Sequence, residues 1–197
     1  MRAKRIFPVV LAFIGVFAAG VASADMGPLA KYIEPRSGEP WDVAWDGDRA
    51  VLTNRSTESR ITYFYVKTPP ELNGHRTVSV DVSLRDPSDK SLGGVLYGYE
   101  ADPETYFLFA VGSDKTVRLY RCEGGSFHER LRLDMPELDL ANTRLGVHET
   151  AGRIELLVNG QPKSTFADAN LGHGAVGIVA AHIGQYVFDD FRIAVDH

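Results

Sequence analysis

Apolar and polar residues alternate with a period of two along most of the chain, and this pattern predicts β-strands. Over residues 77–84, Val78, Val80, Val82 and Leu84 would share one face of a strand, while threonine, serine and aspartate share the other. No segment keeps a helical period for more than about two turns. The predicted strands lie at 41–45, 49–54, 60–66, 76–84, 94–100, 106–111, 116–121, 127–133, 144–149, 153–158, 175–181 and 186–195.

The breaks between these runs have the residues of tight turns. Asp46-Gly-Asp48 and Asp102-Pro-Glu104 are examples, and Asn159-Gly160 is the strongest hairpin signal because both residues tolerate the positive φ of a type I′ turn. Several strands are apolar on one face only, and strands do not alternate with helical segments. The sequence therefore predicts an all-β, antiparallel two-sheet sandwich rather than a parallel α/β fold.

The first 24 residues have the three parts of a secretory signal. A basic start precedes an apolar run over 6–21, and Ala22-Ser23-Ala24 forms a small-x-small cleavage site. The apolar run is shorter than the roughly 20 residues that span a bilayer, which favours a cleaved signal over a membrane anchor. We expect a signal peptide over 1–24, export to the periplasm or the extracellular space, and no membrane span in the mature chain.

The remaining chain has the size and composition of one acidic domain. Residues 25–40 read as an irregular lead-in, and residues 41–197 as the sandwich domain. The net charge of the whole chain is −5, and it becomes more negative without the basic signal, which argues against nucleic acids and anionic membranes as partners. Cys122 is the only cysteine, so no internal disulfide can form, and we expect it to be a buried small apolar residue.

The order of several short motifs carries a family resemblance. The motifs are Trp41 with Trp45, Leu52-Thr-Asn54, the strand at 78–84, Gly93-Gly-Val-Leu-Tyr97, Asp102-Pro-Glu-Thr-Tyr-Phe107, Val117-Arg-Leu-Tyr-Arg121, Ile154-Glu-Leu-Leu-Val-Asn-Gly160, Gly174-Ala-Val-Gly-Ile178 and Phe188-Asp-Asp-Phe-Arg-Ile193. Over about residues 41–195 this series resembles the concanavalin A-like lectin/glucanase superfamily, within it most closely laminin G-like modules and the bacterial 3-keto-disaccharide hydrolase domain. The resemblance implies a jelly-roll sandwich with one concave face, often used for glycans.

Sequence motifs for catalysis are weak. Glucanases of this superfamily in glycoside hydrolase family sixteen use a Glu-x-Asp-x-x-Glu strand, which places two carboxylates about 5 Å apart. The nearest match, Glu137-Leu-Asp139, has Asn142 in place of the second glutamate. The chain has no Gly-x-Ser-x-Gly motif, and its six histidines lack zinc-ligand spacing.

Alternation also indicates which polar side chains face outward. If the apolar residues of 117–119 and 145–147 face the core, the residues between and beside them face solvent, where aromatic rings could stack on sugars and charged groups could bind hydroxyls. The candidate ligand-binding residues are Arg118, Tyr120, Arg144, His148 and Tyr97. Tyr99 and Tyr106 could join them, and each of these tyrosines could instead be a packing residue.

The resemblance also implies a structural calcium ion. In related domains an aspartate of the final strand joins backbone carbonyls from the start of the chain, which is an oxygen ligand set that Ca²⁺ prefers. Asp190 fits this position best, with Asp189 beside it. Alternatively, both are ordinary acids at the edge of the strand.

Together these features predict an exported, non-catalytic, lectin-like module that binds a glycan or glycoconjugate. Two alternatives remain open. One is a hydrolase of the 3-keto-disaccharide type acting on a modified sugar, and the other is a structural or adhesion module that binds protein. A carboxylate cluster with a histidine in the cleft would favour the enzyme, and a flat aromatic and polar face would favour binding.

Signal cleavage is directly testable. N-terminal sequencing of the exported protein should begin at Asp25, because Ala22-Ser23-Ala24 has the small residues that signal peptidase requires. Recovery of an intact Met1 from the membrane fraction would contradict this prediction.

Overall fold

The computed structural model describes residues 26–38, 40–57, 61–69, 75–150, 152–167 and 174–195. Within these residues the chain forms a short 3-10 helix and thirteen strands. The elements are η1 (Gly27–Tyr32), β1 (Trp41–Asp46), β2 (Arg49–Asn54), β3 (Ile61–Val66), β4 (His75–Arg85), β5 (Leu92–Ala101), β6 (Glu104–Gly112), β7 (Thr116–Glu123), β8 (Ser126–Asp134), β9 (Thr143–Thr150), β10 (Arg153–Val158), β11 (Gln161–Ala167), β12 (Ala175–Ala181) and β13 (Gly184–Val195). Among them, no helix has the length and apolarity that crossing a membrane would require.

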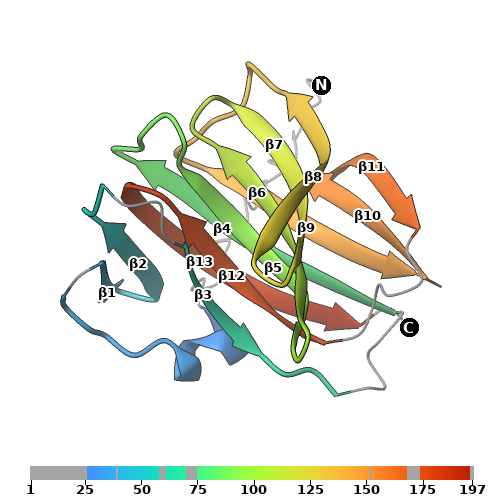
Figure 1. Ribbon diagram of the computed structural model, residues 1–197, viewed down its shortest axis with the longest axis horizontal. Helices are drawn as coiled ribbons and strands as arrows, with labels where there is room; N and C mark the ends of the chain where they lie inside the picture. Colours follow the sequence, from blue (N-terminus) through green and yellow to red (C-terminus); the bar gives the residue numbers. More distant parts are fainter. Residues whose placement is uncertain are drawn as a thin grey trace, which may run out of the picture.

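The strands form two antiparallel sheets packed face to face (Figure 1). Sheet A has the order β1-β2-β13-β4-β9-β10-β11, and sheet B has the order β3-β12-β5-β6-β7-β8. Hairpins join β5 through β8 into one meander and β9 through β11 into another. The last two strands insert between earlier ones, because β12 pairs with β3 and β5 while β13 pairs with β2 and β4.

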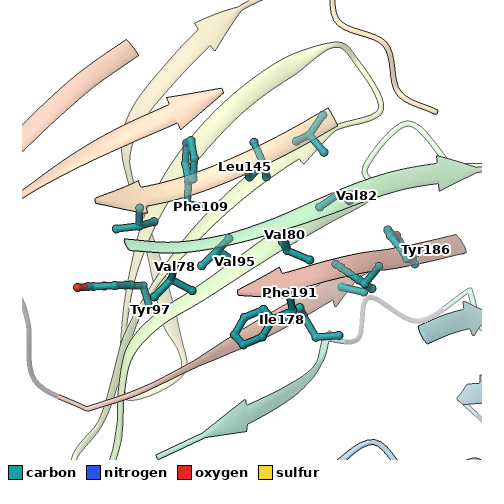
Figure 2. Close-up of a cluster of buried hydrophobic side chains, with 14 of the residues drawn as sticks. Val78, Val80, Val82, Val95, Tyr97, Phe109, Leu145, Ile178, Tyr186 and Phe191 are labelled. Carbon is teal, nitrogen blue, oxygen red and sulfur yellow. The ribbon is translucent and has the colours of Figure 1, made fainter. Parts of the chain in front are cut away.

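The core between the sheets follows the predicted alternation. Figure 2 shows Val78, Val80 and Val82 of β4 among side chains from both sheets. Ile154 and Leu156 on β10 are also fully buried, as the sequence predicts. Cys122 is free and buried, so no disulfide stabilises the domain. The main stabilisation comes instead from removing these apolar side chains from water.

The turn at Asn159-Gly160 agrees with the sequence-based expectation, whereas strand β11 was not expected. Asn159 and Gly160 have φ angles of 52° and 75°, which confirms the predicted hairpin turn. The strand that follows this turn, β11, was absent from the sequence-based assignment. It is a polar, exposed edge strand containing Pro162 and Lys163, so it lacks the apolar alternation on which that assignment relied.

The lead-in segment belongs to the packed domain. Met26, Leu29 and Ile33 are buried in the main core, and Trp45 Nε1 donates a hydrogen bond to the carbonyl of Ile33 at 3.3 Å. Helix η1 lies against β3 and β13. From Met26 onward the lead-in therefore packs with the sandwich, although periodicity placed the sandwich domain from residue 41.

A buried charged network joins the two sheets at one end. Arg76 of β4 lies 3.2 Å from Glu149 Oε2 of β9, and both side chains are almost fully buried. Tyr97 of β5 in sheet B donates its hydroxyl proton to the same carboxylate oxygen, and its ring lies 5.0 Å from the guanidinium group. Arg76 also donates to Thr68, which follows β3. Because a buried charge must be paired, this network fixes how the sheets are placed at this end.

Leu156 and its neighbour Leu157 provide a matched test of the core assignment. Leu156→Ala should lower the free energy of unfolding by about 2–5 kcal/mol, because it leaves a cavity between the sheets. Leu157 points to the other face of β10 and is only partly buried, so Leu157→Ala should cost clearly less. Urea denaturation of both variants measures the difference, and equal losses would mean that the faces of β10 are assigned wrongly.

Candidate functional site

Sheet B is apolar on both faces. Its inner face contributes residues such as Val95, Phe109 and Ile178 to the main core. The alternate positions form a second apolar cluster on the outer face, with Leu96, Leu108 and Val179 among its members. Partly exposed aromatic rings pack over this cluster, and apolar surface that stays accessible can mark a site of interaction.

Six aromatic rings form a continuous row on this outer face. They come from β3, β5, β6, β7 and β8, and are Tyr63, Tyr65, Tyr99, Tyr106, Tyr120 and Phe127; we call them the ring surface. Neighbouring centroids lie 4.6 Å apart for Tyr65–Tyr99, 5.3 Å for Tyr63–Tyr99, 5.9 Å for Tyr99–Tyr106, 6.2 Å for Tyr106–Phe127 and 6.4 Å for Tyr120–Phe127. These separations are typical of mutually packed aromatic side chains.

The aromatic side chains converge at the β3 side of the ring surface. Tyr63 on β3 lies three strands away from β6, which is about 14 Å in a flat sheet. Its hydroxyl nevertheless donates to Glu104 Oε1 of β6 at 3.3 Å, and its ring lies 6.0 Å from that of Tyr106. On the same face, Val179 of β12 is the register partner of Tyr63, and the Tyr99 ring of β5 packs against both the Tyr63 and the Tyr106 rings.

Polar groups border the rings. Tyr120 donates to Glu129 Oε2 at 3.2 Å, and Arg118 Nε lies 3.8 Å from the same oxygen. Burial raises the pKa of the Tyr63, Tyr106 and Tyr120 hydroxyls above the ordinary value of about 10. These phenols therefore remain protonated donors at all physiological pH values, while the carboxylates and Arg118 supply charged hydrogen-bonding groups.

The five sequence-predicted ligand residues do not share one face. Arg118 and Tyr120 lie on the outer face of sheet B, at the ring surface. Arg144 and His148 also point away from the core, but their strand β9 belongs to sheet A, so they lie on the opposite side of the sandwich. Alternation correctly separated inward from outward residues, yet it could not tell which sheet each strand joins.

Tyr97 is a core residue, which corrects its placement on the ligand surface. It is fully buried between the sheets (Figure 2), and its hydroxyl is bonded to the Arg76–Glu149 pair. The cause is a β-bulge after Tyr97, where Gly98 has a φ of 64°. The extra residue turns Tyr99 to the outer face, although a regular strand would place Tyr97 and Tyr99 on the same side.

Several members of the ring surface were not selected from the sequence. Tyr63, Tyr65 and Phe127 lie on strands that were predicted, but their convergence depends on the pairing of β3 with β12 and of β7 with β8. Tyrosine alternation in Ile61–Val66 was a usable signal for a shared face. The glutamates Glu104 and Glu129 had no distinguishing pattern.

The outer face of sheet A holds a cluster of paired charges around Arg144. Its Nη1 donates to both carboxylate oxygens of Asp81 at 3.0 and 3.1 Å and to Asp190 Oδ2 at 2.9 Å. Arg192 Nε donates to Asp190 Oδ1 at 2.6 Å. Burial acts to raise the pKa of Asp190, but the hydrogen bonds from Arg144 and Arg192 outweigh it and lower that pKa below its usual range.

These contacts fit a bound calcium ion poorly. As the resemblance implies, Asp190 lies close to the start of the described chain, because it lines the same surface hollow as Gly27 and Pro28. However, each of its carboxylate oxygens accepts from a guanidinium group, and Asp189 accepts from Arg49 Nε at 2.9 Å. A cation here would lie beside these positive charges, which opposes the attraction of the carboxylates. Among the described residues, no three His, Cys, Asp or Glu side chains group as a metal site.

Comparison with known proteins supports the fold at the level of architecture. No family model matches the chain, and no curated protein matches it. It is similar to the carbohydrate-binding module CBM66 from Bacillus subtilis, with a TM-score of 0.61 and 15% identity over 78% of this chain and 89% of that one. It is also similar to a prokaryotic β-1,3-1,4-glucanase (lichenase) from a mouse hindgut metagenome, with a TM-score of 0.57 and 13% identity over 78% of this chain and 82% of that one.

A third solved structure, the galectin LEC-6 of Caenorhabditis elegans, gives a TM-score of 0.50 and 15% identity over 73% of this chain and 95% of that one. Together with the two antiparallel sheets, these similarities confirm the predicted concanavalin A-like jelly-roll fold. At such low identity they establish the fold and leave the ligand to be inferred from the site.

The charge cluster on sheet A predicts that calcium does not stabilise the protein. Asp190→Asn should lower the melting temperature in chelator and in millimolar calcium alike, since it removes the charged hydrogen bond with partly buried Arg144, worth about 1.5–3 kcal/mol. Asp189→Asn is the matched control and should cost less, because its partner Arg49 is half exposed. Differential scanning fluorimetry measures both.

The same two variants also test the alternative that Asp190 binds a calcium ion. A calcium-dependent rise of several degrees that Asp190→Asn abolishes would identify Asp190 as a metal ligand. The lowered pKa adds a pH signature: the stabilisation by Asp190 is present above the unfolded pKa of about 3.9 and is lost as pH falls through the lower folded value.

Proposed function

We propose that this protein is an exported glycan-binding module and that the ring surface of sheet B holds the sugar. The carrying observation is the continuous row of mutually packed aromatic rings on the outer face of sheet B, with Arg118, Glu104 and Glu129 at its border. Aromatic rings stack on the apolar faces of sugars, and carboxylates and guanidinium groups bind their hydroxyls. A few fixed polar groups around an apolar surface are the usual composition of a small-molecule site.

The comparisons support a sugar as the ligand. One similar structure is a carbohydrate-binding module, one is a galectin and one is a glucanase. These names describe those proteins, and fold alone does not transfer a ligand. Their likeness gains weight here because this chain independently carries an aromatic and polar face on the same kind of sandwich.

Binding without catalysis is favoured over hydrolysis. A retaining glycosidase needs two carboxylates about 5 Å apart with different proton affinities. Glu104 is hydrogen-bonded to Tyr63, and Glu129 is bonded to Tyr120 and lies beside Arg118. The two acids of the ring surface therefore have separate partners and do not form the facing pair that this mechanism needs. The sequence has no identifiable motif for the 3-keto-disaccharide alternative, whereas aromatic rings bordered by polar groups match the expectation for a binding face.

Export is the part of the proposal that depends on the N-terminal segment. Residues 1–24, whose predicted signal lies outside the described residues, read as a signal peptide. A mature domain outside the cytoplasm would meet cell-surface or environmental polysaccharides, which are suitable ligands for an aromatic binding face.

The decisive experiment is a glycan array probed with residues 25–197, followed by calorimetric titration of the best ligand. Phe127→Ala should weaken binding at least about tenfold, the equivalent of ~1.4 kcal/mol, because this exposed ring would lose its stacking contact with the sugar. Tyr32→Ala is the matched control, since Tyr32 is 46% exposed and Phe127 is 45% exposed, but Tyr32 lies on η1 and is not one of the six rings. It should leave the affinity unchanged.

Two outcomes would contradict the proposal. Equal affinity losses in both variants would show that the ring surface is not the binding site. Turnover of ordinary or 3-oxidised disaccharides by residues 25–197, lost in Glu104→Gln or Glu129→Gln, would instead identify a hydrolase.

A further inference from the structure

A pocket of about 290 Å³ opens on the outer face of sheet B at the Phe127 end of the ring surface. Every strand of the sheet contributes one residue to it, and a histidine that follows β12 completes the wall. The lining residues are Ile61, Leu92, Leu108, Tyr120, Phe127, Ala181 and His182. Tyr120 and Phe127 line the pocket and are also members of the ring surface, so the pocket is continuous with the row of rings.

The lining is apolar and uncharged. Four of the residues are aliphatic, and the hydroxyl of Tyr120 is already donated to Glu129. Burial lowers the pKa of the His182 imidazole, and Lys90 adds to the effect while Asp89 opposes it, so this ring is neutral at neutral pH. Among the described residues that line the pocket, none therefore carries a formal charge under those conditions.

This chemistry does not suit a bare sugar ring. A monosaccharide has hydroxyls around its whole edge, and every hydroxyl buried without a partner weakens binding roughly tenfold or more. The aliphatic side chains Ile61, Leu92 and Leu108 offer no such partner. An aliphatic chain, by contrast, loses no hydrogen bonds on entering and gains affinity with every buried methylene.

We propose that this pocket takes the aliphatic chain of an acylated or alkylated sugar, whose sugar ring lies on the adjoining ring surface. The proposal rests on the proposed function and narrows its ligand class. The uncharged lining matches a neutral chain. The volume lies at the lower end of the range for small-molecule sites, which fits one chain rather than the several chains of a membrane lipid. Continuity with Tyr120 and Phe127 places the sugar next to the chain.

The test uses residues 25–197 and n-alkyl β-D-glucosides from methyl to octyl, titrated below their micelle concentrations. Affinity should rise about fourfold per methylene, the equivalent of ~0.8 kcal/mol, until the pocket is filled and then level off. Ala181→Leu fills the pocket from its floor and should abolish this dependence while leaving methyl glucoside binding unchanged. Ala44→Leu, at an exposed position of β1 in sheet A, is the matched control and should preserve it.

Folding of each variant is checked by its melting curve, and Ile61→Phe narrows the same pocket from β3 if Ala181→Leu does not fold. Affinities independent of chain length would overturn the pocket assignment, even if oligosaccharides bind the ring surface and the proposed function stands. An equal dependence for n-alkanols would overturn the assignment to a sugar-borne chain.

Failure of the proposed function has a different signature. An array without binders, together with a chain-length dependence that Ala181→Leu removes and that n-alkanols lack, would support the pocket while contradicting oligosaccharide binding on the rings.

Discussion

Sheet B must bury apolar side chains on both of its faces, and much of the structure follows from this constraint. All residues of β12 are buried, so this strand has no side that could simply be left to water. One face packs against sheet A and forms the main core. The other is lined by a second cluster against which the tyrosine rings pack, so the same apolar excess that stabilises the sandwich produces its candidate site.

The buried Arg76–Glu149–Tyr97 network shows a second, opposing requirement. Desolvating an ion pair is unfavourable, and an apolar replacement can be as stable or more so. The network is nevertheless fully connected, since the carboxylate of Glu149 receives both the guanidinium of Arg76 and the hydroxyl of Tyr97. It links β4 and β9 to β5 across the interface, and we interpret it as specifying how the sheets align rather than as adding stability. Because its side chain points into this network, Tyr97 does not contribute a ring to the ring surface.

Much of the fold could be read from the sequence because pleated strands translate directly into alternation. The buried residues of β4 and β10 and the Asn159-Gly160 turn all followed from local pattern. The site could be read only in part, because sheet membership is a non-local property. Arg118 and Arg144 have the same local signature, yet one borders the rings and the other lies on the far side of the sandwich. A single bulge at Gly98 similarly places Tyr99 on the outer face, whereas Tyr97 stays on the inner face with Val95.

The polar character of the strands that end the two meanders has a consequence for partners. Edge strand β11 contains Pro162 and Lys163, and edge strand β8 is exposed along most of its length, with Glu129, Arg130 and Arg132 among its residues. Proline cannot donate to a further ladder, and charged side chains oppose continuation of the sheet into another polypeptide. Pairing of a further strand with β8 or β11 is therefore disfavoured, and we expect an extended peptide to bind weakly at these edges. At the ends of the two meanders, partner recognition is therefore expected on the faces of the sandwich rather than on these edges.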